Sequence, residues 1–384
     1  MPNSISKSNW GHPPWTVDFH PSRGLIPAEV DFAVVGGGFT GLAATAWIRQ
    51  IDPGKTVALF EAKTIGSASS GHTGGMTLSE SAAGDLPGLG DVLAGFSATL
   101  EALSVDCDLQ LPGVWEIARS GGLPDSPISW TDSGPVRAVK KVPGGTIDPG
   151  KMVSALARAA ESRSVRIFEH APVQAIHFEE RLRLRVLGET IRANAVLLAT
   201  NAMSLELTGL SGHSQPKFTL AVATGPLSNA QLEDIGLNSG KPFYTVDFPY
   251  LWGRVLPSRS VVFGAGLVHL NDWRELDGLD IAKGEAARLI DQLERRVRGL
   301  RPCLQNVQFT HRWGGPILIA DGWRPVFALH PESKNAIVLG GYAGHGVALS
   351  VYLGRWAAEV LCGQNKLPDW NPKGASAQRP YSAK

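Results

Sequence analysis

Residues 31–50 read DFAVVGGGFTGLAATAWIRQ, and this stretch decides the fold. An apolar run that suits a β-strand passes directly into a glycine-rich turn and then into residues that favour a helix. In a turn of this kind Gly36 makes the tight bend, Gly38 lets the backbone approach a pyrophosphate, and Gly41 allows the helix to pack closely on the strand. The order of strand, turn and helix therefore predicts a dinucleotide-binding unit, with the phosphates at the helix N-terminus.

The acidic residue that such a unit needs follows at the expected distance. A second β-rich run, TVALF over 56–60, ends next to Glu61, which lies 20 positions after Gly41. A carboxylate there accepts hydrogen bonds from the adenosine ribose hydroxyls, whereas a 2′-phosphate would require an arginine. The bound nucleotide is therefore expected to be FAD or NAD.

Later segments repeat the alternation of strands and helices and contain a second glycine-rich turn. The residue patterns predict strands over 165–169, 173–177, 195–199 and 336–339, and helices over 151–163 and 348–361. The last strand opens into GGYAGHGV, residues 340–347, directly before the final helix. The sequence thus places a glycine turn at a helix start near each end of the chain.

With these motifs the chain resembles the D-amino-acid-oxidase-like, or glycine/sarcosine-oxidase-like, superfamily of FAD-dependent oxidoreductases. The similar features are GGGFTG with Glu61, the loop SSGHTGGM over 69–76, LLATNA over 197–202 and GGYAGHGV. Within the superfamily, this loop and RWGG over 312–315 are most similar to the gamma-glutamylputrescine-oxidase-like branch. The resemblance implies FAD rather than NAD, because the superfamily packs its late glycine segment on the flavin ring.

The expected fold is α/β, with a discontinuous Rossmann-like FAD-binding domain and an inserted α+β substrate domain built on a mixed or antiparallel sheet. Two distant glycine turns can reach one extended cofactor only if the chain returns to the same domain. We expect the FAD-binding domain to comprise residues 1–85, 147–215 and 311–384, with 1–29 as an N-terminal extension, and the substrate domain to comprise 86–146 and 216–310.

The turns and the resemblance together assign a set of residues to FAD. They are Gly36, Gly38, Phe39, Thr40, Gly41, Glu61, Ala62, Ser70, Gly71, His72, Thr73, Gly74, Gly75, Val173, Thr200, Trp313, Gly315, Gly341, Tyr342, Gly344, Gly346 and Val347. His72 has two open roles, a polar contact or a covalent tether to the flavin, which a histidine forms in the similar dimethylglycine-dehydrogenase-like branch. We expect non-covalent FAD, with the bond through His72 as the alternative.

The candidate catalytic residues come from three later segments. Tyr250, Trp252 and Arg254 fall at alternate positions of a predicted hairpin over 243–267, so one strand face would present an aromatic wall and a cationic floor. Such a pocket suits an amine that carries a carboxylate; the alternative is an amphipathic strand whose aromatics pack in the core. By resemblance, Arg324 reaches the flavin or a substrate carboxylate, with surface pairing as the alternative. The remaining candidate is His345, at the start of the last helix, where the positive helix end favours negative charge on a reduced flavin.

A further tryptophan, Trp115 in LPGVWEIA, has two interpretations. It resembles a position near the substrate cavity of the superfamily, but large aromatics are more often buried for packing.

No local motif for hydrolysis, thiol redox chemistry or metal binding occurs, so the flavin would carry the reaction. The expected function is oxidation of a C–N bond of a small amine or amino acid by hydride transfer to flavin N5, which gives an imine that hydrolyses. Oxygen or another acceptor would reoxidise the flavin. The alternatives are a 2-hydroxy-acid or glycerol-phosphate-type dehydrogenase on the same fold, and a flavin-binding subunit or sensor without turnover.

Two departures from the sarcosine-oxidase branch narrow this expectation. The segment 313–316 has no cysteine, which excludes that branch's cysteine linkage to the flavin. The stretch GAGLVHLND, residues 264–272, has no lysine, whereas the branch uses a lysine to speed the reaction with oxygen. Dehydrogenase activity is therefore favoured over oxidase activity.

Composition excludes several other classes of protein. The 384 residues are 43% hydrophobic, and 36 basic against 35 acidic residues give a net charge of +1, which does not suit a nucleic-acid partner. The spacing of Cys107, Cys303 and Cys362 fits neither a disulfide framework nor a metal site, so no metal is expected. The chain has neither a signal-peptide pattern at its N-terminus nor a membrane-spanning apolar run, and it is expected to be cytoplasmic. The oligomeric state stays open.

Overall fold

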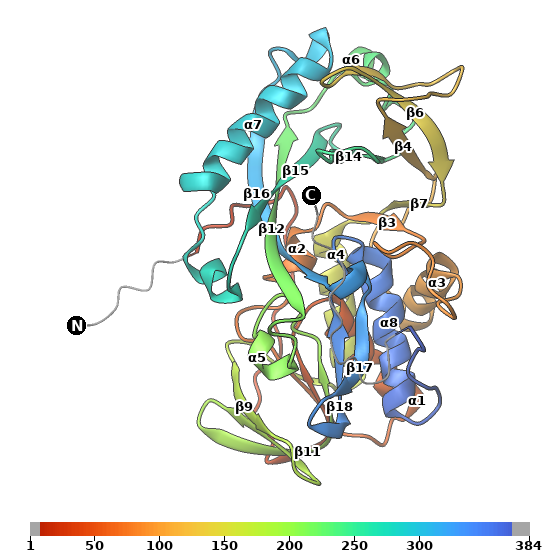
Figure 1. Cartoon of the computed structure of the whole chain (residues 1–384). Helices are drawn as coiled ribbons and strands as arrows, with labels where there is room; N and C mark the ends of the chain where they lie inside the picture. The colour runs from red at the N-terminus through yellow and green to blue at the C-terminus, as the bar shows by residue number, and fades with distance from the viewer. Residues whose placement is uncertain (1–7, 371–384) are drawn as a thin grey trace, which may run out of the picture.

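Two eight-stranded sheets form the framework of the chain, which a computed structural model describes over residues 8–370. The first sheet occupies the lower half of Figure 1 and the second sheet the upper half. Residues 1–7 of the predicted N-terminal extension and residues 371–384 of the predicted FAD-binding domain lie outside the described residues.

The first sheet has the strand order β17-β18-β11-β1-β2-β8, and the strands β9 and β10 pair onward from β11. Its strands are β1 (Glu29–Val35), β2 (Val57–Phe60), β8 (Arg166–Phe168), β9 (Val173–His177), β10 (Leu182–Val186), β11 (Glu189–Leu198), β17 (Val326–His330) and β18 (Ser333–Gly340). The centre is parallel, because β1 pairs in parallel with both β2 and β11. The predicted strands correspond to β8, β9, the end of β11 and β18, which confirms the predicted α/β class.

Helices cover one face of the first sheet, and the β9–β10 hairpin covers part of the other. The helices are α1 (Phe39–Ile51), α3 (Val92–Leu103), α4 (Pro149–Ser162) and α8 (Gly346–Leu361). Val34 of β1 packs in one core with residues of these helices, whereas the next residue, Val35, packs in another with Leu184 of the hairpin. Successive side chains of a strand point to opposite faces, so a sheet covered on both faces needs continuous apolar strands such as FAVV.

The second sheet has the order β16-β12-β15-β14-β13-β4-β6-β5 and is antiparallel except for the parallel pair β13–β4. Its strands are β4 (Val114–Ala118), β5 (Ser129–Thr131), β6 (Pro135–Val142), β12 (Ser214–Thr224), β13 (Phe243–Thr245), β14 (Trp252–Val255), β15 (Val261–His269) and β16 (Phe309–Ala320). Helix α7 (Gly284–Leu300) covers one face, where Ile290 and Val297 pack with Phe218 and Phe263. The mixed, largely antiparallel sheet confirms the predicted architecture of the second unit.

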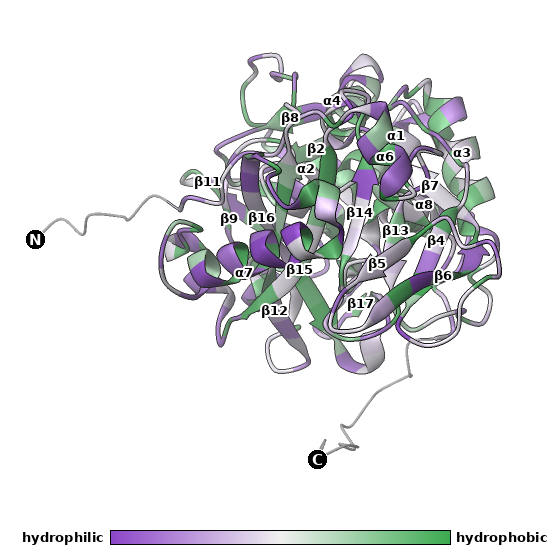
Figure 2. Cartoon of the chain, turned by 90° about the horizontal axis from the view of Figure 1, so that it is seen from above, coloured by the Kyte–Doolittle hydropathy of each residue, from purple (hydrophilic) through white to green (hydrophobic). Residues whose placement is uncertain are grey.

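The remaining elements are short. They are α2 (Ser69–His72), α5 (Leu205–Thr208), α6 (Asn229–Asp234), the 3₁₀ turns η1 (Trp273–Gly278), η2 (Pro302–Leu304) and η3 (Asp321–Trp323), and a ribbon of β3 (Met76–Leu78) with β7 (Gly144–Thr146). In Figure 2, polar residues lie on the outer helix α7, while apolar residues dominate strands such as β2. Within residues 8–370, no helix has the length and apolar character needed to cross a bilayer.

The structure differs from the predicted domain bounds in two places. Helix α3 falls in the predicted substrate segment 86–146, yet its Phe96 and Leu100 pack in the core of α1 and α8. Strand β16 begins before the predicted bound at 311 and pairs along its whole length with β12 in the second sheet. Both differences arise from long-range packing, because local patterns identify an element but not the core that it joins.

The N-terminal segment from residue 8 to residue 28 connects the two halves. The indole of Trp10 donates to the Leu276 carbonyl at 3.1 Å, on the side of the second sheet. The indole of Trp15 donates to the Gly71 carbonyl at 2.8 Å, next to α2. The first bond ties the segment to the second sheet's side, and the second bond ties it to α2, which lies between the two sheets in Figure 1.

Candidate active site

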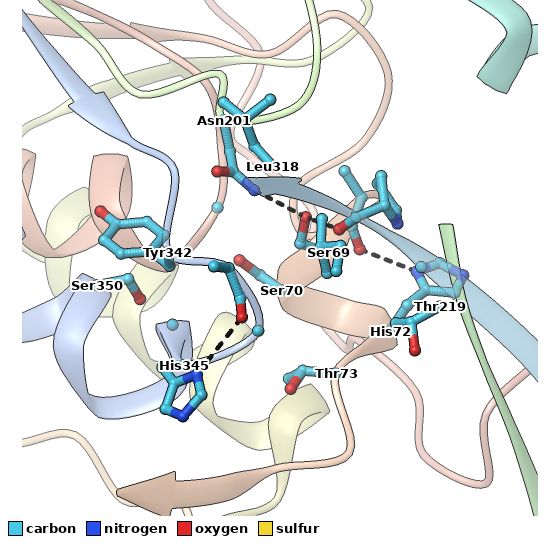
Figure 3. A pocket seen from close by; sticks show the side chains of 18 of the residues that line it. Ser69, Ser70, His72, Thr73, Asn201, Thr219, Leu318, Tyr342, His345 and Ser350 are labelled. Atoms are coloured by element: carbon cyan, nitrogen blue, oxygen red, sulfur yellow. Dashed lines mark hydrogen bonds between the residues drawn. The ribbon is translucent and has the colours of Figure 1, made fainter. Parts of the chain in front are cut away.

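A cavity of about 1230 Å³ lies between the two sheets. Its walls come from the turn before α1, the end of β2, the α2 loop, the start of α8, and the strands β13, β14 and β16. Figure 3 shows that Ser69, Ser70 and His72 from the α2 region and Tyr342 and His345 from the α8 region face this space. The two glycine turns of the sequence therefore meet at one cavity.

The first glycine turn has the geometry that its residues require. Gly36 adopts a φ of +111°, and a Cβ atom there would lie 2.6 Å from the Ala199 carbonyl oxygen. A Cβ atom at Gly41 would lie 2.0 Å from the Gly36 carbonyl oxygen. Gly38 precedes α1 and offers no capping side chain, and the first turn of the helix has no acidic residue. Apart from the Phe39 N–H, which donates to Ser70 Oγ, no described side chain caps the N-terminus of α1, so it can receive an anion from the cavity.

Glu61 lines the cavity at the end of β2. Its carboxylate accepts hydrogen bonds from the backbone N–H groups of Gly37 and Lys63, each at 2.8 Å. Burial raises the pKa of Glu61, and these two bonds oppose that shift. The carboxylate is thus fixed beside the glycine turn, where its predicted role with a ribose stays a prediction.

The α2 loop is tied to both glycine turns and to β16. Ser70 Oγ accepts from the Phe39 N–H at 3.0 Å, and Ser69 Oγ donates to the Pro316 carbonyl at 2.6 Å. Asn201 donates from Nδ2 to Ser69 Oγ at 3.3 Å and accepts from the Gly341 N–H at 2.9 Å. One asparagine therefore joins segments from three parts of the chain.

His72 ends α2 and lines the cavity. Its Nδ1 lies 3.0 Å from the Ala68 carbonyl oxygen, and its ring meets the Trp10 ring edge-on at a centroid distance of 5.8 Å. The backbone carbonyl of His72 accepts from Trp313 Nε1 at 3.0 Å. Because a carbonyl oxygen only accepts, Nδ1 is the donor of this bond and Nε2 carries the lone pair of the ring.

The start of α8 forms the opposite wall. Tyr342 and Thr40 share a hydrogen bond of 2.8 Å between their hydroxyl groups, which links α8 to α1. His345 stands at the N-cap, and its Nδ1 lies 3.4 Å from the Ala343 carbonyl oxygen. Gly346 and Val347 of its first turn line the cavity, and that turn has no acidic residue, so the positive end of α8 is also directed at the cavity.

Most of the residues predicted for FAD line the cavity. They are Gly36, Gly38, Phe39, Thr40, Glu61, Ala62, Ser70, His72, Thr73, Gly74, Val173, Thr200, Trp313, Gly315, Tyr342, Gly344, Gly346 and Val347. Four of the predicted residues do not line the cavity, and they permit close packing or turns instead: Gly41, Gly71, Gly75 and Gly341. The structure thus brings together residues as far apart in sequence as Thr40 and Tyr342, which are separated by 302 positions.

The predicted substrate residues divide into two groups. Tyr250, Trp252, Arg324 and His345 line the cavity. Trp252 lies in β14, and its ring covers Gly74 and Gly264, where Cβ atoms would approach the ring to 2.1 Å and 2.0 Å. Tyr250, however, lies in the loop before β14, so the prediction that three alternate residues share one strand face is wrong for Tyr250.

The prediction that Arg254 forms a cationic floor of the pocket is also wrong. Arg254 lies in β14 but does not line the cavity. Its guanidinium lies over the Trp15 ring at 5.5 Å and beside Gly75, and the residue is only 5% exposed. Its Nε has no partner among the described residues, and burial lowers the pKa of Arg254 to about 10.

Arg324 is a cation that does line the cavity. It follows η3 and is exposed, and within the described chain no hydrogen bond or ion pair engages its guanidinium. Its neighbour Trp323 also lines the cavity. Trp115, in contrast, lies outside the lining and packs at the edge of the second core, which favours the packing interpretation.

Sequence reasoning missed several cavity residues. Trp10 and Asn201 line the cavity, and Tyr244 donates from its hydroxyl to Glu116 Oε1 at 2.7 Å in the same wall. Asn201 stood in the motif LLATNA and could have been identified there. The pair of Tyr244 and Glu116 depends on the parallel pairing of β13 with β4, which no local pattern reveals.

The residues of the cavity fit FAD on structural grounds. The side-chain hydroxyls of Thr200 and Ser350 are buried in the lining and have no hydrogen-bond partner within the described chain. Buried polar groups are rarely left unpaired, so these hydroxyls indicate a polar ligand. Two helix N-termini and a fixed carboxylate in one cavity match the phosphates and ribose of a dinucleotide.

We expect the two cavity histidines to make stability depend on pH. Burial lowers the pKa of both His72 and His345 below the ordinary value of 6.5. The unfolded chain therefore takes up protons at a higher pH than the folded chain. Above about pH 6.5 the two histidines do not reduce the free energy of unfolding, and as the pH drops below that value the free energy of unfolding falls.

Urea unfolding at pH 7.5 and pH 5.5 measures this loss. The variant His345→Gln should lose less stability between these two values than the parent does. His177→Gln replaces an exposed histidine of β9 and should behave like the parent. An equal loss in the parent and in His345→Gln would contradict the assignment.

Comparison with known proteins agrees with this geometry. The family described as FAD dependent oxidoreductase, DAO, matches residues 31–360. Gamma-glutamylputrescine oxidoreductase of Escherichia coli is 24% identical, over 92% of this chain and 90% of its own length. Glycine oxidase of Bacillus subtilis is 23% identical, over 88% and 94% respectively.

A solved structure has the same fold. The crystal structure of glycine oxidase from Geobacillus kaustophilus superposes with a TM-score of 0.70 at 19% identity, and it covers 88% of this chain and 96% of its own. The family match spans both glycine turns and both sheets. The chain therefore belongs to the DAO family of FAD-dependent oxidoreductases.

Proposed function

We propose that this enzyme oxidises a C–N bond of a small amine that carries a carboxylate, such as an amino acid. The observation that carries the proposal is Arg324, a cation in the cavity wall with no ion-pair partner in the described part of the chain. Its planar guanidinium suits a carboxylate, which it can bind through two hydrogen bonds. The relatives named glycine oxidase and gamma-glutamylputrescine oxidoreductase support an amine or amino acid as the substrate class.

The chain's own residues would hold FAD along the cavity. The turn from Gly36 to Thr40 would take the pyrophosphate, Glu61 the adenosine ribose, and the wall between the α2 loop and Gly344 the flavin. Bound FAD supplies the site that accepts a hydride from the carbon next to the substrate nitrogen. The nitrogen loses a proton in the same oxidation, and water then hydrolyses the imine.

Two groups of the wall would assist this oxidation. His345 stays neutral near pH 7, because burial lowers its pKa. With Nδ1 donating to the Ala343 carbonyl, its Nε2 carries a lone pair that can accept a proton from the amine. The rings of Tyr250 and Trp252 would limit the access of water to the reacting carbon.

An anaerobic bleaching experiment tests the proposed function. Purified protein with bound FAD is mixed, without oxygen, with a panel of racemic amino acids, polyamines and 2-hydroxy acids, and absorbance near the visible flavin band is followed. We expect amino acids or amines to bleach the band within seconds. Bleaching by hydroxy acids alone would identify a hydroxy-acid dehydrogenase, and no bleaching by any compound would identify a protein without turnover.

We further propose that the flavin is bound without a covalent bond. The Nδ1 atom of His72 is engaged with Ala68 and the ring is packed on Trp10, which supports a role in shaping the loop. Acid precipitation should therefore leave a colourless pellet and a yellow supernatant. His72→Asn should retain FAD after gel filtration, whereas a yellow pellet in the parent that becomes colourless in this variant would demonstrate a tether.

A further inference from the structure

Two aromatic rings at the cavity stay exposed although they are apolar. The segment 246–250, here called the mouth segment, lies in the connection between β13 and β14 and lines the cavity with Val246, Phe248 and Tyr250. Phe248 is 69% exposed and Tyr250 is 41% exposed, and their ring centroids lie 4.2 Å apart. Apolar surface left in water costs about 25 cal/mol per Å², so this exposure calls for an explanation.

Two arginines hold the backbone of the mouth segment. The Arg119 side chain donates to the Phe248 carbonyl at 2.9 Å, and its backbone N–H donates to the Asp247 carboxylate at 2.7 Å. The Arg296 guanidinium donates to the carbonyls of Pro249 at 2.8 Å and Tyr250 at 3.0 Å. Three consecutive carbonyl groups are therefore fixed by charged donors.

A single buried carboxylate orients both arginines. Asp132 accepts from Arg119 Nη2 at 3.1 Å, and from Arg296 Nε at 3.0 Å and Nη2 at 2.6 Å. The Asp132 side chain is only 7% exposed and that of Arg296 is 13% exposed, so solvent screens this pair weakly. We call Asp132, Arg119 and Arg296 the Asp132 anchor. The anchor draws on three elements, because Asp132 follows β5, Arg119 follows β4 and Arg296 lies in α7.

The anchor touches the cavity only through the mouth segment. None of its three residues lines the cavity, yet the rings that it positions do. A rigid backbone that presents exposed rings lowers the entropic cost of binding an apolar group between them and the cavity wall. Because the rings belong to the cavity lining, the occupant that fits is the substrate itself.

We propose that the Asp132 anchor positions Phe248 and Tyr250 to bind an apolar or aromatic side group of the substrate, and so sets the substrate preference of the enzyme. This inference rests on the proposed amine oxidation, in which Arg324 takes the carboxylate. The anchor residues are positioning residues, since they act only through the mouth segment. Small amines without such a side group would gain nothing from the rings.

The test compares a pair of ligands that differ by one phenyl ring. Binding of phenylacetate and of acetate to the FAD-loaded protein is measured by the shift of the flavin absorption band, which needs no turnover. The ratio of kcat/KM for racemic phenylalanine to that for racemic alanine is measured in parallel. We expect the parent to prefer the phenyl compound about tenfold or more in both assays, which corresponds to about 1.4 kcal/mol.

Four variants separate the anchor from general stability. Phe248→Ala removes an exposed ring directly, and Arg296→Gln and Asp132→Asn loosen its support. Each should lower the phenyl preference about fivefold or more. In Arg296→Gln and Asp132→Asn, which lie outside the cavity lining, the binding of acetate and the kcat for alanine should stay unchanged. Arg288→Gln replaces an exposed arginine of the same helix α7 and should keep the preference of the parent.

The outcomes are distinct. A phenyl preference that is absent in the parent, or that survives in Phe248→Ala and Arg296→Gln, would overturn the inference. An equal loss of acetate and phenylacetate binding in Arg296→Gln would also overturn it, because that pattern indicates a purely structural role. If neither amino acid is oxidised but the preference for phenylacetate depends on Phe248 and Arg296, the proposed oxidation fails while the role of the anchor stands.

Discussion

Replacing Gly41 by alanine is expected to leave the protein folded but almost free of FAD. The new Cβ atom would lie 2.0 Å from the Gly36 carbonyl oxygen and 3.2 Å from Val34, so the turn would have to open. The open turn would move the N-terminus of α1 away from the position that receives the pyrophosphate. We expect FAD retained after gel filtration, measured from the absorption spectrum, to fall about tenfold or more, since a loss of about 1.4 kcal/mol in binding has that effect.

A matched glycine provides the control. Gly299 lies in α7, far along the chain from the turn, and a methyl group there meets no atom within 4 Å. Gly299→Ala should keep the parent's FAD content and raise stability by about 0.5–1 kcal/mol, because alanine favours the helix. Circular dichroism establishes whether Gly41→Ala is folded. A folded Gly41→Ala variant with full FAD content would contradict the assigned role of the turn.

Replacing Arg324 by glutamine is expected to remove most of the discrimination in favour of a substrate carboxylate. The measurement is kcat/KM for the best amino acid of the panel and for the corresponding amine without the carboxylate. A hydrogen bond to a charged group contributes about 1.5–3 kcal/mol, so kcat/KM for the amino acid should fall about 10- to 100-fold. The value for the plain amine should change little, because that compound never engages the guanidinium.

Two further variants make this experiment decisive. Arg324→Lys keeps the charge but not the planar fork, so an intermediate loss is expected. Arg185→Gln replaces an exposed arginine of β10 and should leave both rates unchanged. An equal fall for the amino acid and the amine in Arg324→Gln would show that Arg324 supports the wall of the cavity and does not recognise the carboxylate.

Much of the FAD half of the site could be predicted from short stretches of sequence. Gly36, Gly38 and Gly41 lie in one turn and the helix start that follows it, and Glu61 directly follows the next strand, so local backbone geometry relates them. The substrate half could not be predicted in the same way. The alternate spacing of Tyr250, Trp252 and Arg254 suggested one strand face, but β14 begins only at Trp252. Strand β14 is short, and the guanidinium of Arg254 packs over the Trp15 ring, so Trp252 lines the cavity and Arg254 does not.

The sequence by itself determined the family, the order of strands and helices, and the glycine turns, because these depend on local periodicity and on residues with special backbone freedom. Only the tertiary structure decided that Asn201 bonds to Gly341, that Arg324 rather than Arg254 lines the cavity, and that Asp132 supports the mouth segment through Arg296. Asp132 and Arg296 are 164 residues apart. Contacts of that kind arise from how sheets pair and helices pack, and they cannot be predicted from the residues next to them in the sequence.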